Sequence, residues 1–160
     1  MLGIKIICVG KLKEDYFIRA QDEYIKRLGA FCRPEIVEIP ENRLPASPSK
    51  AQIEDALGRE AEAILSKIQR SDCVISLCVE GPAATSEEFA GILQAEAVSG
   101  SSKIVFLIGG SHGLSEKVKQ ASGRRLSLSK MTLPHHLARI VLLEQVYRAF
   151  MILSGGKYHK

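Results

Sequence analysis

The chain has 160 residues, of which 46% are hydrophobic and 25% are charged, and it carries a net charge of +4 at pH 7. This balance is typical of a globular domain, and a chain of this length buries roughly 70% of its unfolded surface when it folds. No apolar run approaches the ~20 residues that cross a bilayer, and the first residues lack the basic and apolar segments of a signal peptide. We therefore expect a single domain over residues 1–160, with no membrane span and no secretion signal.

Strand-like and helical patterns alternate in the first half of the chain. β-branched residues over 4–9 predict a strand. Apolar residues then recur at helical spacing over 17–28, and an alternating pattern over 35–39 predicts a half-buried strand. After a loop marked by three prolines, a second amphipathic helix is expected over 53–68.

The second half of the chain continues the alternation. A nearly continuous apolar run predicts a strand over 73–79, and a capping-box pattern begins a helix at Thr85. Further strands are expected over 104–108 and, as a short fifth one, over 126–129, before a long helix over 135–153. Continuous apolar strands between helices indicate an α/β fold with a parallel sheet that helices cover on both faces.

The four cysteines indicate a reducing compartment. They form no C-x-x-C pair, and Cys8, Cys73 and Cys78 lie in or beside apolar strand-like runs. Cysteine in such runs behaves as a small hydrophobic residue. We therefore expect reduced, mostly buried thiols and a cytoplasmic protein.

Charge is distributed unevenly along the chain. Residues 117–160 hold nine Lys or Arg against one acid, a net charge of +8, whereas the remainder carries −4. A basic end on an acidic body favours nucleic acid as a partner, although a merely solvated basic face has the same composition.

A glycine-rich loop over 109–114 follows the apolar strand 104–108. Glycines after a buried strand allow the backbone to approach a ligand closely, although such loops also serve as plain turns. The P-loop pattern is absent, and the spacing G-G-x-x-G, with no acid near Ser129, does not match a dinucleotide fingerprint. The pattern therefore leaves open that the glycine loop binds some other adenosine-bearing ligand.

The segment 128–134 joins the last strand to the last helix. It combines apolar side chains with backbone donors and acceptors, which suits a purine ring, but an ordinary connecting loop looks the same. His135 and His136 follow and are adjacent in sequence, so we expect them to point in different directions and to form no metal pair.

The last helix and the tail carry an unusual density of polar groups. Glu144 and Arg148 are spaced i,i+4, which most often means a surface ion pair contributing less than ~1 kcal/mol. Tyr158 and His159 lie in a terminal tail, where side chains able to stack and to hydrogen-bond are uncommon. Histidine also titrates near neutral pH, as a general base should.

Together these segments resemble the ribosomal RNA large-subunit methyltransferase H family (RlmH) of the SPOUT superfamily, over essentially the whole chain. The resemblance extends from Val9-Gly10-Lys11-Leu12-Lys13 and Glu23-Tyr24-x-Lys26-Arg27 to the end. Its most specific parts are Ile108-Gly109-Gly110-Ser111-x-Gly113-Leu114, Leu126-Ser127-Leu128-Ser129-Lys130-Met131-Thr132-Leu133-Pro134-His135, Glu144-Gln145-Val146-Tyr147-Arg148-Ala149 and Tyr158-His159.

The resemblance implies a SPOUT-type α/β fold whose C-terminal part threads a trefoil knot, which periodicity alone does not predict. It implies a homodimer in which one subunit's tail helps to complete its partner's site. The implied activity is transfer of a methyl group from S-adenosylmethionine (SAM), without a metal, to N3 of a pseudouridine in a 23S rRNA stem-loop of the assembled ribosome.

By resemblance, the cofactor is bound by the end of the third strand, by the glycine loop and by the loop before the last helix: Leu77, Gly109, Leu128, Ser129, Lys130, Met131, Thr132 and Leu133. For catalysis we expect His159 to assist deprotonation of N3 or to orient the base, and Tyr158 to hold the tail. Arg148 then stabilises the developing anionic oxygen, and Glu144 orients Arg148.

Two alternatives remain at this stage. A catalytically silent ribosome- or RNA-binding factor would keep the fold without the chemistry, and the glycine loop with Tyr158 and His159 argues against it. A nucleotide-dependent oxidoreductase is disfavoured by the missing acid, and binding of labelled SAM but not NAD would separate the two.

Overall fold

The computed structural model describes all 160 residues and contains one five-stranded sheet in the order β2-β1-β4-β3-β5. All neighbouring strands pair in parallel. The strands are β1 (Gly3–Val9), β2 (Arg33–Ile39), β3 (Cys73–Leu77), β4 (Lys103–Ile108) and β5 (Arg124–Leu126). The helices are α1 (Asp15–Leu28), α2 (Lys50–Leu65), α3 (Ser86–Val98), α4 (Glu116–Ala121) and α5 (His135–Leu153).

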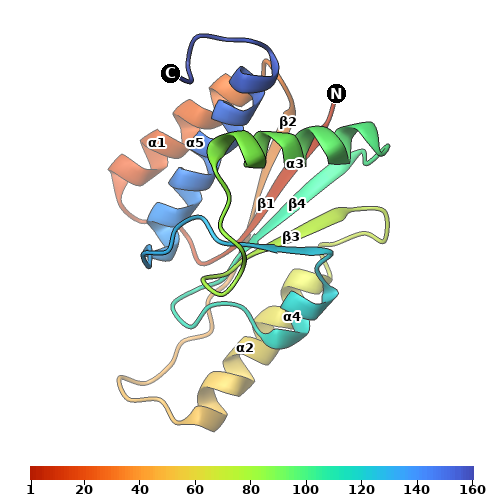
Figure 1. Cartoon of the computed structure of the whole chain (residues 1–160). Helices are drawn as coiled ribbons and strands as arrows, with labels where there is room; N and C mark the ends of the chain where they lie inside the picture. Colours follow the sequence, from red (N-terminus) through yellow and green to blue (C-terminus); the bar gives the residue numbers. More distant parts are fainter.

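Helices cover both faces of the sheet, as the apolar strands predict. In Figure 1, α1, α3 and α5 lie on one face, and α2 and α4 lie on the other. Because side chains alternate along a strand, β1 supplies Ile4 and Ile6 to the first face and Ile7 and Val9 to the second. Each such side chain, once fully buried, contributes about 1.5–3 kcal/mol to folding.

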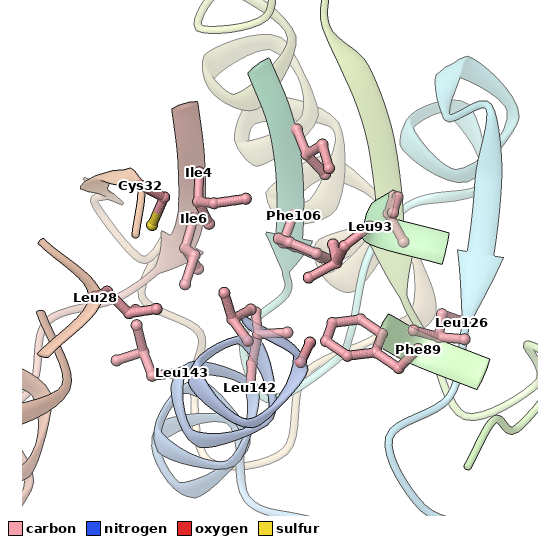
Figure 2. Packing of buried hydrophobic residues seen from close by; sticks show 14 of the residues in the cluster. Ile4, Ile6, Leu28, Cys32, Phe89, Leu93, Phe106, Leu126, Leu142 and Leu143 are labelled. Carbon is pink, nitrogen blue, oxygen red and sulfur yellow. The ribbon is translucent and has the colours of Figure 1, made fainter. Parts of the chain in front are cut away.

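Helix α5 is the centre of the larger hydrophobic cluster. Leu142 and Leu143 pack between the sheet and the helices beside it, near Leu28 of α1 and Phe89 of α3 (Figure 2). The same helix places a guanidinium in the interior, because Arg139 is only 1% exposed. The helix is therefore fixed by apolar packing and by one buried charge.

Buried Arg139 is compensated by groups from three other segments. It donates hydrogen bonds to the Glu38 carboxylate at 2.8 Å, to the Gln21 side chain at 3.2 Å and to the Gly10 carbonyl at 3.0 Å. A buried charge with such partners ties the start of α5 to β2, α1 and the end of β1.

The structure confirms the alternation of elements and corrects some of their positions. The fifth strand lies over 124–126 instead of 126–129; beyond it, Ser127 makes only an isolated bridge to Ala83 and its Oγ donates to the Ser129 carbonyl. The third strand ends at Leu77, where a turn follows. Helix α4 was not predicted, because six residues give too little periodicity to read.

None of the helices is both long enough and apolar enough to cross a membrane. The four cysteines are free thiols; Cys8 and Cys32 are buried, and Cys73 and Cys78 are half-buried.

Candidate active site

A cavity of about 690 Å³ opens at the edge of the sheet where the parallel strands end. The loops after β3, β4 and β5 form its walls, and the start of α5 closes it. In open parallel sheets this edge is where ligands bind. The lining residues are Leu77, Cys78, Val79, Glu80, Ile108, Gly109, Gly110, Ser111, His112, Gly113, Leu114, Lys119, Ser127, Leu128, Ser129, Met131, Thr132, Leu133, Pro134, His135 and Ala138.

The glycine loop after β4 folds tightly onto itself. A Cβ atom on Gly109 would lie 2.3 Å from the carbonyl carbon of Gly113 and 2.4 Å from its oxygen. Gly113 has a φ of +73°, a conformation that glycine adopts without strain. Glycine is therefore required at position 109 because the backbone of Gly113 approaches it closely, and at position 113 because φ is positive there.

The loop before α5 forms the opposite wall. Ser129 accepts a hydrogen bond from the Met131 amide at 3.0 Å, which holds the loop open around the cavity. Seven of the eight residues that the resemblance assigns to the cofactor line this cavity, and Lys130 does not. The seven are Leu77, Gly109, Leu128, Ser129, Met131, Thr132 and Leu133.

An ion pair between Glu80 and Lys119 lies in the cavity wall, and the sequence analysis did not predict it. The hydrogen bond from Lys119 lowers the pKa of the Glu80 carboxyl, which is therefore ionised at neutral pH. The two residues are 39 positions apart, one after β3 and one on α4. No local pattern joins them, which is why sequence reasoning missed them.

The four residues assigned to catalysis meet at the C-terminal half of α5. Arg148 donates two hydrogen bonds to Glu144 Oε1, from Nε at 2.9 Å and from Nη2 at 2.7 Å. The Tyr158 hydroxyl donates to the same oxygen at 3.1 Å, and Arg148 Nη1 lies 3.3 Å from His159 Nδ1. The tail therefore folds back onto α5 instead of extending away from it.

Aromatic contacts and buried charge hold the tail in place. The Arg148 guanidinium lies 4.7 Å from the centre of the Tyr158 ring, which also packs edge-on against Tyr147. Burial, and then the hydrogen bond to Glu144, raise the pKa of Tyr158 to about 12. The phenol is therefore neutral at physiological pH and acts as a hydrogen-bond donor.

His159 is held between two charged side chains. Its Nε2 lies 2.8 Å from Glu87 Oε1 at the start of α3, and its Nδ1 faces Arg148. Arginine can only donate, so Nδ1 accepts and the proton of a neutral imidazole is on Nε2. Both ring nitrogens of His159 therefore have a hydrogen-bond partner in this arrangement of the tail.

Within one chain, the tail cluster and the cavity are separate. They share no residue, although both contact α5. Ala138 lines the cavity, whereas Glu144 and Arg148 lie six and ten residues further along, about 9 and 15 Å along the helix axis. The residues expected to bind the cofactor and those expected to act in catalysis therefore form two separate groups within one chain, here called the half-sites.

The expectation for His135 and His136 was wrong in its geometry. Their rings lie edge-on with centres 4.1 Å apart, and both face Gly10 after β1, where an added Cβ would lie 3.8 Å from His135 Nε2 and 4.0 Å from His136 Nε2. Burial, and then the neighbouring His136, lower the pKa of His135. No group of three or more His, Cys, Asp or Glu side chains in the structure is arranged to hold a metal ion.

The basic C-terminal segment is less available than its composition suggests. Four of its nine cations form ion pairs with acids, namely Lys119 with Glu80, Arg125 with Glu116, Arg139 with Glu38 and Arg148 with Glu144. Much of the charge asymmetry seen along the sequence is therefore neutralised when the chain folds.

The family model described as a predicted SPOUT methyltransferase matches residues 2–159. The chain belongs to the SPOUT methyltransferase family.

Relatives extend over the same length. Three proteins named ribosomal RNA large subunit methyltransferase H are 48%, 49% and 47% identical over 159 residues, 99% of this chain and all of each relative. They come from Leuconostoc mesenteroides, Lactobacillus delbrueckii and Listeria monocytogenes.

Two solved structures share the fold. A probable methylase family protein from Haemophilus influenzae has a TM-score of 0.52 at 18% identity, covering 98% of this chain and 70% of that one. A probable methyltransferase from Bordetella pertussis has a TM-score of 0.58 at 17% identity, covering 92% and 93%. At these identities the likeness concerns the fold alone.

Proposed function

We propose that residues 1–160 form one cytoplasmic domain that transfers a methyl group from SAM to N3 of a pseudouridine in 23S rRNA, with the assembled ribosome as substrate. The observation that carries this proposal is the cavity between the glycine loop and the 128–133 loop, in a chain nearly half identical to relatives named for large-subunit rRNA methylation. The family membership supports SAM as the methyl donor.

The residues of the cavity suit SAM. The cavity's volume of about 690 Å³ lies within the usual range for small-molecule sites, roughly 300–1,000 Å³. Leu77, Ile108 and Leu128 offer apolar surface to a purine, and the hydroxyls of Ser129 and Thr132 offer hydrogen bonds. When bound, SAM supplies a methyl group on a sulfonium, which is already an activated leaving group, so positioning accounts for much of the rate.

The tail cluster has the groups that the nucleotide requires. N3 of pseudouridine is a weak acid, so the step needs a base to take its proton and a cation beside the oxygen that gains negative charge. When Arg148 Nη1 turns from His159 Nδ1 to that oxygen, Nδ1 of the neutral imidazole takes the proton and Arg148 stabilises the oxygen. Glu144 fixes Arg148 through two hydrogen bonds, and neutral Tyr158 anchors the tail on Glu144.

The separation of the two half-sites favours a homodimer. The half-exposed face of α5 carries Leu137 and Val141, one helical turn apart, whereas the other side of the helix is buried in the core. A second copy packed on this face would bury these side chains and bring its tail to the cavity. His159 Nδ1 would then exchange its contact with Arg148 for the nucleotide.

Mixing two inactive variants tests whether subunits share a site. Gly109→Ala damages the cavity, and His159→Ala damages the tail, so each homodimer is expected to be inactive. A mixed dimer has one site with an intact cavity and an intact tail. Random exchange at equal concentrations should therefore restore about a quarter of the wild-type rate. No recovery, with mixed dimers shown by mass spectrometry, would place cavity and tail of one site in one subunit.

The activity itself is tested by transfer of labelled methyl from SAM to ribosomes lacking the modification, to free large subunits and to naked 23S rRNA. We expect label on assembled ribosomes, and a fall of roughly 10²- to 10⁴-fold for His159→Ala and Arg148→Ala. Unchanged rates in both variants would exclude the assigned roles. No label on any substrate, from a folded protein, would favour the silent RNA-binding factor.

A further inference from the structure

A second cavity lies beside the first and has a different character. It encloses about 870 Å³, and only three of its 17 lining residues are hydrophobic. The loop after β1 and the loop after β2 form most of it, and the glycine loop and the start of α5 complete it. Most of its lining residues are polar or charged, which suits a charged or strongly hydrated ligand.

The cavity has a surplus of positive charge. Lys11, Lys13 and Arg43 line it, and none of them lies within 4.0 Å of an acid. Of the two acids in the lining, Glu38 is neutralised by buried Arg139. Glu41 alone opposes the three cations, so an anion is the favoured ligand.

Local structure fixes where these cations lie. Leu12 is buried between Lys11 and Lys13, so the loop after β1 is anchored and both lysines remain at the surface. Gly10, with a φ of +90°, turns the chain there, and a Cβ on it would lie 3.7 Å from Glu41 and 3.8 Å from His135. The cations are therefore presented by a packed turn.

The two cavities adjoin one another. Ser111, His112 and His135 line both of them, and Ser111 donates to Glu41 across the junction at 3.2 Å. A ligand that crosses this junction has one part beside the glycine loop and another part among the cations. Because these cations lie on two separate loops, they match an extended polyanion better than a single compact phosphate.

We propose that this second cavity binds the phosphodiester backbone of the RNA strand next to the nucleotide that is methylated. The inference rests on the proposed function, since it assigns the backbone site of the same substrate. Lys11, Lys13 and Arg43 are positioning residues: they hold phosphates and do not touch the reacting atoms. The main phosphate contacts are thus assigned to cations of the acidic body of the chain, Lys11, Lys13 and Arg43, and not to those of the basic C-terminal segment.

The test compares Lys11→Ala/Lys13→Ala with wild type and with Lys67→Ala, which removes an exposed lysine just beyond α2 and outside both cavities. Binding to ribosomes lacking the modification is measured without SAM over a range of salt. Each lost phosphate contact lowers the slope of log K against log salt by about 0.7 for a single strand, so the double variant should lose about 1.4. Lys67→Ala should match wild type.

Two further readouts separate this proposal from a structural effect and from the proposed function. The double variant should raise the KM for ribosomes while kcat and the calorimetric SAM affinity stay unchanged. Glu41→Gln, which keeps an acceptor for Ser111 and removes the opposing charge, should tighten RNA binding roughly twofold to fivefold.

Two results for the double variant would overturn the proposal. One is a slope of log K against log salt equal to that of wild type, and the other is a loss of SAM affinity instead of a loss of ribosome binding. If inorganic phosphate at millimolar concentration displaced the ribosome as well as a single-stranded RNA did, the site would be one for free phosphate. Failure of the wild-type protein to methylate any substrate would refute the proposed function. The comparison of ribosome binding would still decide whether the second cavity binds the RNA backbone.

Discussion

Replacing Gly109 by alanine tests the central claim about the cofactor cavity. The added methyl carbon would lie 2.3 Å from the carbonyl carbon of Gly113, about 1.1 Å inside the 3.4 Å of ordinary contact. The neighbouring atoms all belong to the backbone, so no side chain can rotate away. The glycine loop must therefore open by about 1 Å.

Such overpacking costs about 1–3 kcal/mol of unfolding free energy. A misplacement of about 1 Å in a site that works by positioning lowers the rate roughly 10²-fold. We therefore expect Gly109→Ala to remain folded, to bind SAM weakly in calorimetry and to transfer methyl about a hundredfold more slowly.

Gly58→Ala is the matched control for this substitution. Gly58 lies inside α2, where a Cβ would meet nothing within 4 Å, so alanine should raise the unfolding free energy in urea by about 0.4–1 kcal/mol and leave SAM affinity unchanged. Wild-type stability together with wild-type SAM affinity in Gly109→Ala would refute the argument, because the loop would then have no need of close backbone approach.

Three further outcomes follow from the buried and paired charges. Glu38→Ala leaves the Arg139 guanidinium buried without its carboxylate and should lower the free energy of unfolding in urea by about 3–5 kcal/mol. Arg139→Met should lower it less, because the Glu38 carboxylate left behind is partly exposed to water. A larger loss in Arg139→Met than in Glu38→Ala would contradict the role given to the buried charge. Glu144→Gln removes the charge that helps to hold the Tyr158 proton, so the Tyr158 pKa should fall from about 12 toward 10 in an ultraviolet titration of tyrosinate. Because that pKa is raised in the folded chain, the tail's stability is fully present below pH 10 and is lost as pH rises toward 12, which protease cleavage after residue 153 would detect.

Much of the fold follows from local pattern. The apolar runs over 4–9 and 104–108 predict central strands because a strand buried on both faces needs apolar side chains on both. Thr85 forms the predicted capping box with Glu88. The short helix α4 and the position of β5 escaped prediction because three to six residues carry too little periodicity.

The candidate cofactor site was predictable in part. The glycine loop and the 128–133 loop stand out in the sequence, and the resemblance assigned seven residues that line the cavity. Glu80 and Lys119 were missed because they meet only through the packing of α4 beside β3.

What the sequence determined by itself is the order of strands and helices, the parallel sheet with two covered faces, and the loops that end at one edge of it. These features depend on the spacing of hydrophobic residues and on turn-forming residues, both of which can be recognised from residues close together in the sequence. Only the tertiary structure decided that Arg139 is buried against Glu38 and that His159 lies on Glu87 at α3. It also placed Lys11 and Arg43 around one polar cavity. These contacts join residues tens of positions apart, so their energies depend on packing and burial that no local pattern records.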